Sequence, residues 1–221
     1  MKINLRNEAP LLLLALLPFA YLYLRWNEIP ERVPLHWNIH GEADRWGPKG
    51  ELWMIPLLTC GLIYLILLVV PAIDPKGKIK LMGVKYQQLR YILVGVMSAL
   101  ALAIIYFVAE GGTHITMAIL LLIGLLITLL GNYFKTLRPN YFIGIRTPWT
   151  LEDPDIWDRT HRLGGVLWFG GGILLMLIAI LLRGPIQFYL FMGLTLLLAL
   201  VPVGYSYGRY RKSKKGGRAE S

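Results

Sequence analysis

The chain has 221 residues, of which 56% are hydrophobic and only 16% are charged, and its mean hydropathy is +0.54. A soluble domain has a smaller apolar share, so this composition excludes that class and predicts an integral membrane protein. The formal net charge of +10 suits basic loops that face anionic membrane lipids, and it gives no reason to expect nucleic acid as a partner.

Six apolar runs predict six membrane-spanning helices. They cover residues 10–24, 52–71, 91–109, 115–133, 163–182 and 186–205. Each is near the ~20 residues that a helix needs to cross ~30 Å of hydrocarbon, and none alternates as a β-barrel strand does. We therefore predict an all-α, multi-pass protein of the cell membrane, a bundle of six transmembrane helices. No acidic residue lies inside the runs, which argues against an ion pathway through the bundle.

The basic residues predict the orientation of the chain. If the N-terminus is cytoplasmic, 18 of the 23 Lys and Arg residues lie on the cytoplasmic side. Both termini are then cytoplasmic. We divide the chain into an N-terminal two-helix unit at 1–90 with a structured extracellular loop at 27–51, a four-helix unit at 91–205 with a cytoplasmic loop at 134–162, and a basic disordered tail at 206–221.

The outer loop at residues 27–51 is rich in Pro, Gly, His and Trp, which predicts a compact fold rather than a floppy linker. His36, His40 and Asp44 are candidate zinc or copper ligands. Their spacing matches no metal motif, and nearby Gly and Pro break any helix that would align both imidazoles. We therefore expect no metal and no other cofactor. We interpret His36 as a packing group and Asp44 as a partner of Arg45 or Lys49.

The inner loop at residues 140–162 combines polar residues with many apolar ones. Prolines at 139 and 148 disfavour a helix in its first half. In the second half, residues 150–153 have capping-box form, and Asp153 before Pro154 is an alternative N-cap, so a helix should begin there. Trp157 and His161 then share one face of that helix. Glycines at 164, 165 and 170–172 predict close approach of another helix or of a ligand.

Two segments resemble known families. The segment VPLHWNIHGEADRWGPK at 33–49 resembles a small N-terminal domain of unknown function in bacterial membrane proteins. The segments RPNYFIGIRTPWTL at 138–151 and WDRTHRLGG at 157–165 are similar to the signature of the SdpI family. This resemblance implies an immunity protein that protects a bacterial cell from an extracellular peptide toxin. It also implies a signalling role, in which a winged-helix transcriptional repressor is held at the membrane.

We predict two sets of site residues, and the resemblance points to the inner one. The outer set, either toxin-binding or structural, is His36, Trp37, Asn38, Gly41, Asp44 and Lys49. The inner, partner-binding set is Asn140, Gly144, Arg146, Thr147, Pro148, Trp149, Thr150, Trp157 and His161. We expect the inner set to form an exposed surface, because aromatic and arginine side chains are enriched at binding hot spots. Arg146 is also a candidate anchor to lipid phosphate.

Two other classes of function stay open. One is a membrane enzyme that acts on a lipid or peptide through His36, His40 and Asp44, or through Arg146 and His161. The other is a small transporter that exports a toxic peptide. The sequence contains no metalloprotease motif, nucleophile elbow, phosphate loop or dinucleotide fingerprint. We therefore assign no catalytic residue and favour a non-enzymatic role, with membrane lipids, a toxin and a repressor as partners.

Overall fold

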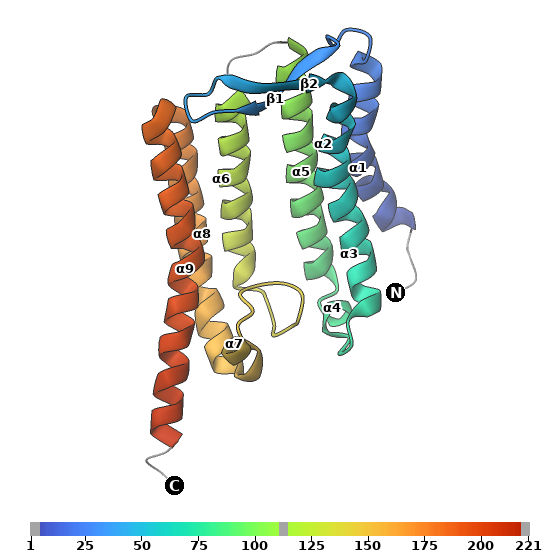
Figure 1. The fold of residues 1–221 in the computed structure, drawn as a ribbon. Coiled ribbons are helices and arrows are strands. Elements are labelled where there is room, and N and C mark those ends of the chain that lie inside the picture. The colour runs from blue at the N-terminus through green and yellow to red at the C-terminus, as the bar shows by residue number, and fades with distance from the viewer. Residues whose placement is uncertain (1–4, 111–114, 218–221) are drawn as a thin grey trace.

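The protein is a bundle of membrane-spanning helices capped at one end by a β-hairpin (Figure 1). The computed structural model describes residues 5–110 and 115–217, and six helical segments there are long and apolar enough to cross a membrane, which confirms the predicted fold class. The elements are α1 (Leu5–Arg25), β1 (Arg32–Trp37), β2 (Ala43–Pro48), η1 (Lys49–Trp53), α2 (Met54–Pro56), η2 (Leu57–Gly61), α3 (Leu62–Ile73), α4 (Lys78–Leu81), α5 (Val84–Glu110), α6 (Ile115–Phe134), α7 (Pro148–Glu152), α8 (Pro154–Leu181) and α9 (Gly184–Gly217).

The predicted compact outer loop is a β-hairpin, a two-stranded sheet in a chain that is otherwise helical. Strands β1 and β2 pair antiparallel and lie across the end of the bundle (Figure 1). The Asn38 side chain closes the turn, because its oxygen accepts from the backbone N–H groups of His40 at 2.9 Å and Glu42 at 3.0 Å. Gly41 completes the turn with a φ of +81°, a conformation that side chains disfavour.

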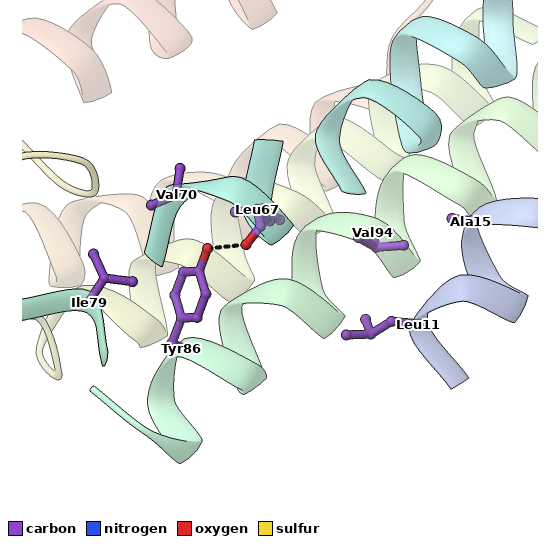
Figure 2. Packing of buried hydrophobic residues seen from close by; sticks show 7 residues of the cluster. All are labelled: Leu11, Ala15, Leu67, Val70, Ile79, Tyr86 and Val94. Atoms are coloured by element: carbon purple, nitrogen blue, oxygen red, sulfur yellow. Dashed lines mark hydrogen bonds between the residues drawn. The ribbon is translucent and has the colours of Figure 1, made fainter. Parts of the chain in front are cut away.

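The N-terminal half is built around α1, α3 and α5, which share one apolar core. Leu11 and Ala15 of α1 pack there with Val94 of α5 (Figure 2). At the end away from the hairpin, the hydroxyl of Tyr86 donates to the backbone carbonyl of Leu67, as Figure 2 shows. This bond satisfies a polar group in an apolar setting and fixes α5 against α3.

A buried ion pair joins α1 to α5. The Arg90 guanidinium donates to both carboxylate oxygens of Glu8, at 2.6 and 2.7 Å, and the two residues are only 1% and 6% exposed. The Tyr64 hydroxyl of α3 donates to the same carboxylate at 3.4 Å. Such a bidentate pair ties together the helices that carry it. The domain boundary that we placed between residues 90 and 91 falls inside α5, which is one continuous helix.

In the C-terminal half, glycines bring α6 and α8 into backbone contact, as the glycine pattern predicted. A Cβ on Gly172 would lie 2.3 Å from Oγ1 of Thr128 and 2.7 Å from the carbonyl oxygen of Gly124. At a second contact between the same two helices, a Cβ on Gly131 would lie 2.3 Å from the backbone nitrogen of Phe169. Close packing of this kind replaces the hydrophobic drive that helices lack in lipid.

The prediction of a disordered tail from residue 206 is wrong for the part that the structure describes. Helix α9 continues to Gly217. Its last turns are held by contacts with the inner loop: Arg209 lies 3.1 Å from the carboxylate of Asp155, and the Tyr210 ring stacks on Trp149 at 5.8 Å. Composition alone misses such a helix because its polar face is stabilised by residues far away in the sequence. Residues 218–221 lie outside the described residues.

The glycine contact predicts a contrast between two alanine substitutions in α8. Gly172→Ala forces a methyl group into the backbone of α6 and should lower stability by about 2 kcal/mol. Gly170→Ala is the matched control, because a Cβ there meets nothing within 4 Å. The unfolding midpoints of both purified variants in detergent micelles measure the difference. Equal midpoints would contradict the packing described here.

Candidate functional site

The part of the inner loop that lies between α6 and α7 is organised by Asn140, which is only 2% exposed. Its side-chain amide donates to the backbone carbonyls of Arg138 at 2.9 Å and Ile143 at 3.1 Å. Its oxygen accepts from the backbone N–H groups of Phe142 at 2.9 Å and Ile143 at 2.7 Å. The Asn140 side chain therefore supplies hydrogen bonds to loop backbone groups that regular secondary structure would otherwise pair, and its role is structural.

The loop ends in two consecutive helix starts. The short helix α7 begins after Thr147, whose side chain forms a capping box with Thr150, so the box lies three residues before its predicted position. Thr150 is fully buried, and its hydroxyl donates to the carbonyl of Ile145 at 2.9 Å. Asp153 caps α8 by accepting from the backbone nitrogens of Asp155 and Ile156, with Pro154 at the first helical position as predicted.

His161 fastens this loop to α8. The backbone N–H of Ile145 donates to Nε2 at 2.9 Å, and Nδ1 lies 2.8 Å from the carbonyl oxygen of Trp157. Since a carbonyl only accepts, Nδ1 carries the proton. Nε2 accepts from Ile145 and therefore carries none, so the ring is neutral. The Trp157 ring stacks on the imidazole at 4.0 Å and donates its own N–H to the carbonyl of Leu137 at 3.0 Å. These bonds make His161 a fastening residue, with no free nitrogen for acid–base chemistry.

The structure corrects the expectation that the inner set forms one exposed surface. Trp157 and His161 are 0% and 1% exposed. Trp149 is half-buried against α9, where its indole N–H donates to the hydroxyl of Ser206 at 2.7 Å. Aromatic rings at the end of an apolar core are more stable packed against helices than in water. Of the predicted inner set, Arg146 and Pro148 are exposed, and Arg146 donates to a loop carbonyl.

The hairpin presents a different kind of site. His36 and Asp44 are bonded at 2.6 Å, and their side chains are 63% and 42% exposed. Asp44 was expected to pair with Arg45 or Lys49, but neighbouring residues in a strand point to opposite faces, and Lys49 pairs with Glu31 at 2.8 Å instead. Lys49, Asn38 and Gly41 thus shape the hairpin, whereas His36 and Asp44 face outward.

Two grooves flank the hairpin at the bundle end. A cavity of about 610 Å³ lies between the hairpin, α6 and α9, and its lining includes His36, Asp44, Leu120 and Phe188. A second cavity of about 630 Å³ lies between the hairpin and the end of α5. Trp37 lines both. The first groove sets the His36–Asp44 pair against apolar walls, and the second adds the charged Arg32, Glu42 and Glu110 to an apolar lining. Apolar walls with a few polar groups are the pattern of a site that binds a ligand.

The histidines of the hairpin do not assemble a metal site. Among the residues that the structure describes, no three His, Cys, Asp or Glu side chains are grouped closely enough to hold an ion. His36 and Asp44 are together, but His40 lies in the turn, where its backbone bonds to Asn38.

Several structural residues escaped the sequence analysis. Glu8 lies two residues before the first apolar run, and Arg90 lies directly before the third. Opposite charges at the same end of two predicted spans were therefore the signal from which this ion pair could have been predicted. Ser206, which accepts from Trp149, carried no signal of its own.

The contact between Gly144 and His161 predicts another matched pair. Gly144 has a φ of +109°, and a Cβ there would lie 2.4 Å from Nε2 of His161. Gly144→Ala should therefore displace the imidazole and lower stability by about 3 kcal/mol. Gly77→Ala also introduces a side chain at positive φ, +63°, but in open space, and should cost about 1 kcal/mol. Unfolding midpoints and proteolysis of residues 134–162 report both effects, and equal losses would refute the fastening role.

Comparisons with known proteins match both ends of this architecture. Residues 136–206 match the SdpI/YfhL protein family, and residues 13–60 match a domain of unknown function (DUF1648). The first match covers the inner loop, α7, α8 and most of α9, whereas the second covers most of α1, the hairpin and the start of the next membrane span. The chain is also 24% identical over 203 residues to Immunity protein SdpI of Bacillus subtilis (strain 168), covering 91% of this chain and 94% of that protein. No solved structure matches.

The inner loop with its buried Trp157 and His161 thus coincides with a family domain, and the hairpin with a second one. The chain thus carries a match to the SdpI/YfhL family at residues 136–206, preceded by a DUF1648 match at residues 13–60, and it is similar over nearly its whole length to an SdpI immunity protein.

Proposed function

We propose that this protein is a membrane immunity protein that protects its cell from an extracellular peptide toxin. The observation that carries the proposal is the similarity to Immunity protein SdpI across nearly the whole of both chains. Because the similarity includes hairpin and inner loop alike, the relative's immunity function is transferred with the complete architecture rather than with one module.

The hairpin end is the face on which we place the toxin. Its two grooves have apolar walls, and Trp46 beside them is 52% exposed. A peptide that acts on membranes carries apolar side chains, which such grooves would bury. The bonded His36 and Asp44 add a polar pair at the groove wall that suits a peptide backbone.

The opposite end is the face on which we place the cytoplasmic partner, a repressor. Its exposed surface is smaller than the sequence suggested: Arg146 and Pro148 lie in the open, and the neighbouring Tyr141 is 39% exposed. Arginine and tyrosine are both enriched at binding hot spots. The buried Trp157 and His161 support this surface from behind.

Survival of toxin-exposed cells tests the division between the two ends. The test strain is a Bacillus subtilis strain that lacks its own immunity protein, grown beside toxin-producing cells. The chain should restore survival, and Asp44→Asn or His36→Ala should reduce it roughly tenfold or more, because a charge-assisted hydrogen bond is lost.

Arg45→Gln is the matched control on the other face of the same strand, and Arg146→Ala is the control at the opposite end. Both should keep the survival of the unaltered protein at equal membrane levels. If the unaltered chain gives no survival although it reaches the membrane, the proposed immunity function is wrong. If Arg146→Ala abolishes survival as well, the two ends do not divide the work.

A further inference from the structure

A third cavity, of about 660 Å³, lies on the flank of the bundle where α6 and α8 touch. Its lining includes Gly131 of α6 and Gly165, Val166, Phe169 and Gly170 of α8. Val166 and Phe169 are 74% and 46% exposed, and a Cβ on Gly170 would meet nothing within 4 Å. The glycines therefore create an apolar groove on a surface that faces the bilayer rather than the bundle core.

Two basic side chains close one end of this groove. Lys135 directly follows α6, and Arg162 directly precedes the apolar run of α8, so both stand at the same boundary of the apolar core. Lipid phosphates lie at this depth. The amide of Asn132 lines the groove beside them.

Lys135 and Arg162 differ from Arg159 and Arg209 in having no ion pair with a described residue. Arg159 and Arg209 both pair with the carboxylate of Asp155, at 2.8 and 3.1 Å. The side chains of Lys135 and Arg162 have no hydrogen bond or ion pair with any residue that the structure describes, and no carboxylate lines their groove. Two like charges that share one cavity favour binding of an anion, and a phosphate suits both a guanidinium and an ammonium.

We propose that this groove binds one anionic phospholipid, whose phosphate lies on Lys135 and Arg162 and whose acyl chain covers Gly165 and Gly170. The groove from Arg162 to Gly170 spans about 12 Å of helix, most of one leaflet's share of the ~30 Å apolar core. A second copy of the chain is a poorer occupant, because a symmetric contact through this groove would bring four cations together. The inference is independent of the proposed immunity function.

Native mass spectrometry of the purified full-length protein tests the proposal. The probes are phosphatidylglycerol and, as a zwitterionic comparison, phosphatidylethanolamine with the same acyl chains. The unaltered protein should retain one phosphatidylglycerol in preference to phosphatidylethanolamine. Lys135→Gln with Arg162→Gln should weaken that adduct roughly tenfold or more, since each cation near lipid contributes to binding.

The matched control removes the same charge elsewhere: Lys212→Gln with Lys214→Gln, on the last turns of α9, should leave the adduct unchanged. Gly170→Leu keeps both cations but fills the groove, and it should weaken the adduct as well, which covers the case in which the double variant does not fold. Equal loss in the groove and tail variants would mean unspecific attraction and would overturn the proposal. A dimer cross-linked through α6 and α8, with no lipid bound, would also overturn it.

Discussion

In an apolar solvent every polar group of a chain depends on a partner within the chain, and this constraint explains most of the present structure. The loop that joins α6 to α7 enters the end of the bundle with backbone groups that no helix satisfies. Asn140, Thr150 and His161 supply the missing partners from their side chains. The same constraint draws Glu8 and Arg90 together between α1 and α5. Specific polar contacts and glycine contacts, rather than a hydrophobic drive, hold the helices in register.

The constraint gives the two ends of the bundle different capacities. At the loop end most of the predicted site residues already bond to or pack against other parts of the protein, so few of their polar groups are free to bind a ligand. At the hairpin end His36, Asp44 and Trp37 line open grooves. This contrast is why we place the toxin at the hairpin and restrict the cytoplasmic partner to the small surface around Arg146. It also explains why Trp157 and His161, which belong to the SdpI-like segment, are buried rather than exposed.

Much of this could be predicted from the sequence. Continuous apolar runs identified the spans because length and hydropathy suffice for that purpose. Asp153 before Pro154 marked the start of α8, since capping is a local property. The hairpin and the burial of Trp157 could not be predicted, because both depend on which distant residues lie opposite. The helical end of α9 was missed for the same reason: Trp149 and Asp155, which support it, are some fifty residues away.

The account requires that the hairpin and the inner loop face opposite sides of the membrane, with the hairpin outside. Cysteine labelling in intact cells measures this most directly, after the buried Cys60 is replaced by Ala. Glu42→Cys in the hairpin turn and Glu152→Cys at the end of α7 both place a thiol at an exposed position. An impermeant maleimide should label the first and leave the second unmodified until the membrane is permeabilised. Labelling of the second but not the first would invert the orientation and contradict the assignment of both faces.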